Sequence, residues 1–313
     1  DVYTRDTKDM LMNVSYPDIL GTAAPKSNAA DLRTKGWELS ATWHDKVGTN
    51  WNYGLTLALS DNTSKITRYL NPTGAIDQYY VGKDIGEIWA YETVGIFQTE
   101  ADVAASANQD QLGAAWKAGD MQYADLNKDD KITPGVRTLN DHGDLRIVGN
   151  TTPRYSFGIN GDISYKGIGL NVFFQGVMKR DYLPDNGNWN AFYPYNDGHL
   201  EKYAISESWT ETNRDAYFAA PTFGYNTKKN IHPQSRYVQN ASYIRLKNLS
   251  VSYQFPVKLI QKVRLNGAQI YFAGMNLWEA TKMHKPLDPE SVFTVTQEYY
   301  LQRIFTLGVK LNF

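Results

Sequence analysis

Three oxygen-bearing side chains lie at every second position of one short loop, in the segment DLNKDDKI. They are Asp125, Asn127 and Asp129, and the backbone carbonyl of Lys131 would follow two residues later. Hard divalent cations bind such oxygens, and this spacing matches the first half of a calcium-binding loop. The loop is therefore a candidate site for Ca²⁺, with Mg²⁺ as the less favoured ion because the loop is flexible.

The same loop departs from the calcium-binding pattern at two positions. Asp130 stands where the turn glycine belongs, and Val136 stands where the pattern has a bidentate acid. Asp and Asn side chains also stabilise turns by hydrogen bonding to the backbone. An Asx-rich turn without metal therefore explains the same residues, and with either interpretation the loop orders a long connection.

A second candidate site lies in segment 182–238, where aromatic residues alternate with Asn and Asp. Sugar rings stack on aromatic side chains, while amides and carboxylates hydrogen-bond to the hydroxyls. We predict substrate contacts at Trp189 and Tyr193. A loop that packs on itself or grips a partner protein would have the same composition.

The composition excludes several other kinds of site. The 313 residues contain no Cys and only five His, so cysteine nucleophiles, cysteine-bound zinc and disulfides are excluded. The formal net charge is -1, which removes the positive surface expected of a nucleic-acid-binding protein. No nucleophile has an adjacent base in the sequence, so we predict that the chain is not an enzyme.

Alternating apolar and polar residues predict β-strands that would position these loops. A helix is predicted near 102–117, and a bulge is predicted where the apolar positions change phase between Phe272 and Met275. The predicted strands are an opening strand to Met12, then 37–43, 51–59, 155–165, 168–174, 249–255, 270–278 and a strand that ends at Phe313.

The connections between these strands alternate between short and long. The short turns are 44–50, 166–169 and 256–266, and the long loops are 13–33, 62–152, 182–238 and 279–300. Long structureless loops are uncommon inside compact soluble domains, whereas transmembrane β-barrels have short periplasmic turns and long extracellular loops. The pattern favours a barrel over the alternative, a soluble β-sandwich.

The terminal strand has one continuous apolar face. Thr306, Gly308, Lys310 and Asn312 lie on its other face. In a barrel the apolar face would contact lipid and the polar face would line the lumen. The apolar residues are Phe305, Leu307, Val309, Leu311 and Phe313.

Eight phrases occur in a fixed order along the chain. They are SNAADLRTKGWELSATW, YETVGIFQTEAD, GDMQYADLNKDDKI, LRIVGNTTPRYSFGIN, SESWTETNRDAYFA, NASYIRLKNLSVSYQFP, GMNLWEATK with LDPE, and LQRIFTLGVKLNF. Together, and in this order, they resemble the C-terminal part of the SusC/RagA family of TonB-dependent outer-membrane transporters.

This resemblance implies an all-β fold, an antiparallel transmembrane β-barrel of roughly 22 strands. Residues 1–313 would supply about the last eight strands, while the plug and the TonB box would lie in residues absent here. The resemblance adds Asp144 to the metal ligands, and makes the apolar residues that end in Phe313 a membrane-insertion signal.

The resemblance also implies a function in the bacterial outer membrane. The expected activity is TonB-dependent import of oligomeric nutrients, with glycans favoured over peptides as the substrate, and with a SusD-like surface lipoprotein as partner. Two alternatives stay open at this point. One is a soluble, Ca²⁺-dependent carbohydrate-binding β-domain, and the other is a self-contained eight-stranded structural or adhesive barrel.

Overall fold

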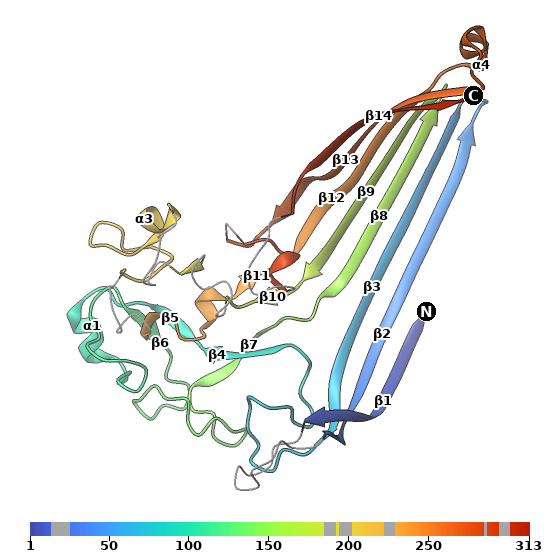
Figure 1. Cartoon of the computed structure of the whole chain (residues 1–313). Coiled ribbons are helices and arrows are strands. Elements are labelled where there is room, and N and C mark those ends of the chain that lie inside the picture. The colour runs from blue at the N-terminus through green and yellow to red at the C-terminus, as the bar shows by residue number, and fades with distance from the viewer. Residues whose placement is uncertain (14–25, 185–191, 194–201, 222–228, 285–286, 294–300) are drawn as a thin grey trace.

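Eight long strands form one antiparallel sheet (Figure 1). The structure is a computed structural model that describes residues 1–13, 26–184, 192–193, 202–221, 229–284, 287–293 and 301–313. All eight predicted strands are confirmed. In spatial order they are β1 (Val2–Asn13), β2 (Lys26–Val47), β3 (Trp51–Tyr69), β8 (Arg154–Tyr165), β9 (Ile168–Lys179), β12 (Tyr243–Gln254), β13 (Gly267–Thr281) and β14 (Ile304–Asn312).

Two strands are longer than their apolar alternation predicts. β2 and β3 extend into the predicted loops 13–33 and 62–152. In these extensions charged residues pair across the strands, Arg33 with Asp6 at 2.7 Å and Arg68 with Asp31 at 2.7 Å. Backbone pairing and ion pairs therefore continue the strands where no apolar periodicity exists, and the predicted loop boundaries were wrong there.

The two faces of the sheet differ in polarity. Residues directly opposite one another on neighbouring strands share a face, so each face can be followed in rows across the sheet. One row across the sheet is apolar: Leu307, Phe272, Val251, Leu170, Ile163 and Tyr53. The adjacent row, on the other face, is polar or small apart from Tyr271: Gly308, Tyr271, Ser252, Gly169, Ser164 and Asn52.

A bulge lies on β13, just beyond the predicted place. The register of β12 and β13 shifts between Leu246 and Asn248, which face Trp278 and Met275. Asn276 absorbs the extra residue with a φ of 53°. The pairing of β13 with β14 is regular from Gly267 to Met275. The bulge therefore begins after Met275, immediately beyond the segment where the apolar residues change phase.

Short connections lie at one end of the sheet and long connections at the other (Figure 1). The β12–β13 connection contains α4 (Val257–Ile260) and η4 (Gln261–Val263). The long connections contain β4 (Glu87–Tyr91), β5 (Thr93–Ile96), α1 (Glu100–Ala105), β6 (Met121–Tyr123), β7 (Leu145–Asn150), β10 (Asp181–Tyr182), α3 (Tyr203–Glu207), η3 (Ser235–Tyr237), β11 (Gln239–Asn240) and η5 (Ser291–Phe293).

The helix α1 is shorter than predicted. Thr99 and Asp102 form a capping box at its first turn, as the sequence favours. The helix ends at Ala105, and Asn108 then pairs through its backbone with Asp130 and Ile132. The predicted extension to Lys117 was wrong because Asn108 pairs with a distant segment and the residues after it form a turn, in which the backbone of Leu112 donates to the carbonyl of Gln109.

The sheet is open at both sides. β1 and β14 are its edge strands, and they do not pair with each other among the described residues. A self-contained eight-stranded barrel is therefore not what these residues form. No helix in the described ranges has the length and apolar character needed to cross a membrane.

Candidate functional site

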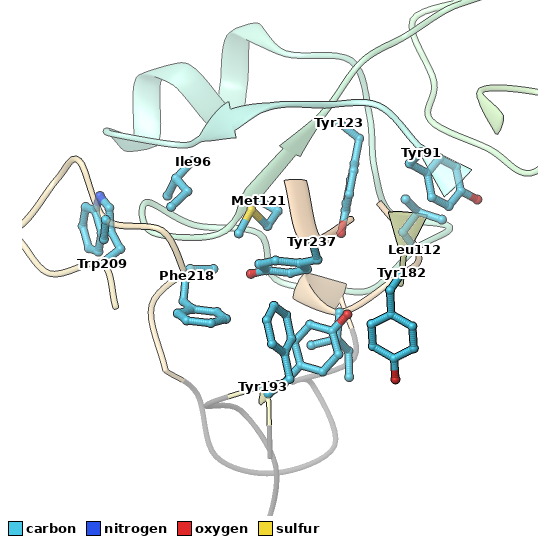
Figure 2. Close-up of a cluster of buried hydrophobic side chains, with 14 of the residues drawn as sticks. Tyr91, Ile96, Leu112, Met121, Tyr123, Tyr182, Tyr193, Trp209, Phe218 and Tyr237 are labelled. Carbon is cyan, nitrogen blue, oxygen red and sulfur yellow. The ribbon is translucent and has the colours of Figure 1, made fainter. Parts of the chain in front are cut away.

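The long connections pack together around one cluster of buried side chains (Figure 2). A cluster of buried apolar side chains in the described residues therefore lies among the loops, whereas many apolar side chains of the sheet are exposed. Residues of the cluster include Tyr91, Ile96, Leu112, Met121, Tyr123, Tyr182, Phe192, Tyr193, Trp209, Phe218, Tyr237, Met283 and Leu287. We call this cluster the loop core.

A buried ion pair joins two of the long loops. Lys229 lies 2.6 Å from Asp120, and the two residues are 3 % and 0 % exposed. Asn230 donates a hydrogen bond to the same carboxylate at 2.9 Å and accepts one from the backbone of Met121 at 2.9 Å. These contacts fix segment 229–234 against β6, and no sequence pattern pointed to them because the partners are far apart in the chain.

The two predicted substrate contacts have different positions. Trp189 lies outside the described residues. Tyr193 is 3 % exposed, and its ring centroid lies 4.9 Å from that of Phe192 and 5.1 Å from that of Tyr237. This position gives Tyr193 a packing role in the loop core, and its contact with substrate stays a prediction.

The candidate metal loop is an Asx-rich turn in this structure. Asp125 accepts backbone hydrogen bonds from Lys128 at 2.6 Å and from Asp130 at 2.8 Å. Asn127 accepts one from Asp129 at 3.2 Å. Asp130 occupies the position of the turn glycine with a φ of 61°, a left-handed conformation that Asp tolerates better than most residues.

Asp144 closes this loop from the other side. Its carboxylate is buried and accepts backbone hydrogen bonds from Leu126 and Thr133, both at 2.7 Å. The structure therefore brings Asp144 to the two ends of the segment that holds Asp125, Asn127, Asp129 and Lys131. Within the described ranges, no group of three or more acidic or histidine side chains has a metal-binding arrangement. Metal binding stays a prediction.

Calcium binding can be tested through the stability of this loop. If the prediction is right, Ca²⁺ at roughly 100 times its dissociation constant should stabilise the loop by about 2.7 kcal/mol. Hydrogen exchange of residues 125–131 would measure this, with Mg²⁺ compared at the same concentration. Asp129→Ala should abolish the effect, whereas Glu211→Gln, an exposed acid elsewhere, should not. If neither Ca²⁺ nor Mg²⁺ changes the hydrogen exchange of residues 125–131, the metal prediction is wrong and the loop is an Asx-rich turn without metal.

Arg245 is the centre of a charge cluster at the outer end of β12. It is 2 % exposed, and its guanidinium donates hydrogen bonds to Glu279, Glu290 and, at 2.6 Å, Asp288. Lys247 lies 3.1 Å from Glu290. The role of Asp288 and Glu290, in the phrase LDPE, was missed.

We expect His232 to make the stability of the loop core depend on pH. Burial lowers the pKa of its imidazole below the ordinary 6.5, against the opposing effect of its hydrogen bond to the carbonyl of Leu112. The folded state therefore prefers neutral His232, while the unfolded chain takes up a proton near pH 6.5. The contribution of this group to stability is complete above that pH and is lost as the pH falls below it.

We accordingly expect faster hydrogen exchange in segment 229–237 at roughly pH 5.5 than at roughly pH 7.5, after correction for intrinsic exchange. His232→Gln retains a donor for Leu112 and should remove this pH dependence. His44→Gln changes an exposed histidine on β2 and should leave the dependence intact. An unchanged pH response in the His232 variant would contradict the assignment.

Five apolar residues at alternating positions from Phe305 to Phe313 are exposed, with exposed fractions between 47 % and 87 %, and the first four of them lie in β14. They continue the apolar face across the sheet, as the pairing of Phe305 with Gly274 and of Val309 with Ile270 shows. Aromatic residues lie at one end of this face. Trp51, Tyr165 and Tyr253 belong to the row of paired residues that crosses the sheet from Val309. The residues proposed as an insertion signal are Phe305, Leu307, Val309, Leu311 and Phe313.

Comparison with known proteins relates the whole chain to one group. No family model matches the chain. It is 25 % identical over its whole length to TonB-dependent receptor P3 of Formosa agariphila, and 26 % identical over 99 % of its length to TonB-dependent receptor P26 of the same organism. The chain is a homologue of TonB-dependent receptors. It spans 32 % of the length of each of these two receptors.

Solved structures assign the fold of this TonB-dependent receptor homologue. It superposes with a TM-score of 0.72 on a structure of the RagAB peptide transporter, at 22 % identity, over 99 % of this chain and 32 % of that one. An open-open state of the RagAB peptide importer gives a TM-score of 0.71 at 23 % identity. The eight-stranded sheet therefore has the fold of part of an antiparallel β-barrel. The related proteins are named as receptors and transporters, not as enzymes.

Proposed function

We propose that this chain is the C-terminal part of the β-barrel of a TonB-dependent importer in the bacterial outer membrane. The observation that carries the proposal is the exposed apolar face of the sheet, opposite a polar face. Such a face suits lipid on one side and an aqueous lumen on the other. Residues outside this chain would complete the barrel beside the open edges of β1 and β14.

The exposed apolar face argues against a soluble carbohydrate-binding domain. Leu307 and Phe305 are 74 % and 64 % exposed, and the apolar row of Leu307 continues across β13, β12, β9, β8 and β3. Contiguous apolar patches of this kind mark membrane or protein contacts rather than a water-exposed surface. The loop core supplies the only large buried apolar cluster found in the described part of the chain.

For the substrate we propose an oligomeric nutrient, either an oligosaccharide or a peptide. The described aromatic residues that suggested sugar stacking, including Phe192, Trp209 and Phe218, are buried in the loop core. They cannot serve as open platforms in this conformation, so the support for glycans rests on the sequence of segment 182–238. The support for peptides rests on the structural neighbour that is named a peptide transporter.

The partners follow from the same proposal. A SusD-like surface lipoprotein would cover the outer loops, and TonB would act through the part of the protein that precedes this chain. The RagAB neighbours support a two-component transporter. We expect the full-length protein to copurify with a lipoprotein after extraction from membranes in mild detergent.

Fractionation and uptake of the full-length protein test the proposal. We expect the protein in the outer-membrane fraction, extracted only by detergent. A strain that lacks it should lose growth on one class of oligomer, supplied as defined oligosaccharides or as peptides, and should keep growth on the corresponding monomers. Recovery of the protein in the soluble fraction without detergent would overturn the barrel assignment, and growth unchanged on both classes would overturn the transport assignment.

A further inference from the structure

The connection between β12 and β13 differs in charge from the other short turns of the sheet. We call residues 255–266 the β12–β13 turn. It lies at the end of the sheet where the C-terminus lies, and α4 projects beyond the strands there (Figure 1). Its sequence, FPVKLIQKVRLN, contains three basic residues and no acid. The β8–β9 turn, in contrast, consists of Lys166 and Gly167 alone.

The three basic side chains of this turn are exposed. They are Lys258, Lys262 and Arg264. None of them forms an ion pair in the described part of the chain. Arg264 ends η4 in a left-handed conformation, with a φ of 61°. The turn therefore holds three positive charges, and none of them pairs with a carboxylate of the described residues.

Exposed apolar side chains lie beside Lys258 in the sequence of this turn. Val257 and Leu259 are 54 % and 56 % exposed, whereas Ile260 is 6 % exposed. The carbonyl of Ile260 accepts a hydrogen bond from the backbone of Leu265 at 3.2 Å, which closes the turn on itself. Burial of Ile260 thus fixes a small structure that presents apolar and basic groups together, the composition of segments that lie in a membrane interface.

The apolar face of the sheet continues into this turn. An open groove of about 530 Å³ on that face has a lining that includes Ile270, Leu307 and Tyr253. The ring centroid of Tyr253 lies 5.0 Å from that of Phe255, the first residue of the turn. A lipid acyl chain that follows the groove would therefore bring its headgroup to the basic side chains.

We propose that the β12–β13 turn binds the headgroups of anionic phospholipids at the membrane surface. The proposal rests on the proposed function, which places the apolar face of the sheet in a lipid bilayer. Each Lys or Arg near an anionic membrane surface contributes about 1 kcal/mol, and the contribution decreases with salt. The exposed Val257 and Leu259 would enter the boundary between headgroups and acyl chains.

Native mass spectrometry of the full-length protein in detergent tests this inference, with phosphatidylglycerol and phosphatidylcholine of the same acyl chains as probes. We expect preferential binding of phosphatidylglycerol. Substitution of Lys258, Lys262 and Arg264 together by Gln should weaken this binding by roughly 100-fold, because each of the three charges contributes about 1 kcal/mol. A charge-conserving variant, Lys258→Arg with Lys262→Arg and Arg264→Lys, should bind as the parent does.

A matched control removes three exposed basic residues from the long loops, Lys117, Lys202 and Arg214, again by change to Gln. It alters the net charge equally and should keep the preference for phosphatidylglycerol. Lipid binding is compared only for protein recovered from the outer-membrane fraction. Absence of the parent protein from that fraction would contradict the proposed function, whereas the lipid comparison tests only this inference. Equal binding of both lipids, equal loss in the matched control, or displacement of phosphatidylglycerol by inorganic phosphate would overturn the inference.

Discussion

Arg245→Met is expected to release segment 287–293 from the wall of the sheet. Arg245 is 2 % exposed, and its guanidinium bonds to Glu279, Asp288 and Glu290 at once. The substitution would keep the packing volume but leave these carboxylates without their central cation. Removing one partner of a buried ion pair costs about 3–5 kcal/mol, because the remaining charge loses its compensation.

Hydrogen exchange in the full-length protein would measure this opening. Residues 287–293 should exchange as an unprotected loop in the variant, while the strands β8 and β9 should retain their protection. Lys247→Met is the matched control, since Lys247 contacts only Glu290 among the three acids and is more exposed. We expect a much smaller effect from it. Equal effects of the two substitutions would show that Arg245 does not organise the cluster.

The sheet could be predicted from sequence because apolar and polar residues alternate along its strands, so that one face is apolar and the other is polar. Leu249, Val251 and Tyr253 alternate with polar residues, and the same alternation recurs in six other segments or their parts, whereas the opening strand to Met12 is mostly polar. The outer parts of β2 and β3 could not be predicted this way, since both of their faces are polar. Their pairing depends on residues such as Arg33 and Asp6, whose contact is set by the register and not by local pattern.

The candidate sites were less predictable, because their contacts join distant segments. Asp125 and its neighbours form a recognisable loop, since the loop is local in sequence. Asp120 and Lys229 each look like ordinary surface residues in sequence, yet they meet in the loop core. Tyr193 illustrates the same limit: an aromatic residue in a polar loop suits a ligand or a core equally well, and only the fold separates the two.

Leu307→Arg should impair assembly of the full-length protein in the outer membrane. Leu307 is 74 % exposed in the middle of the apolar face of β14, paired with Phe272. If that face contacts lipid, an arginine near the middle of the bilayer costs about 2–4 kcal/mol. The folded fraction in the outer membrane, measured by the heat-dependent shift of the barrel on gel electrophoresis, should therefore decrease strongly.

Thr306→Arg places the same charge one residue earlier, on the opposite face of the same strand. Thr306 pairs with Ala273 in the polar face, where water would solvate the guanidinium, so its cost should be small. Leu307→Ala separates loss of the side chain from gain of the charge, and should be tolerated better than Leu307→Arg. Since the two arginine variants differ only in the face that carries the charge, their order reports which face meets lipid. A larger defect in Thr306→Arg would reverse the two faces and, with them, the assignment of the membrane-insertion signal.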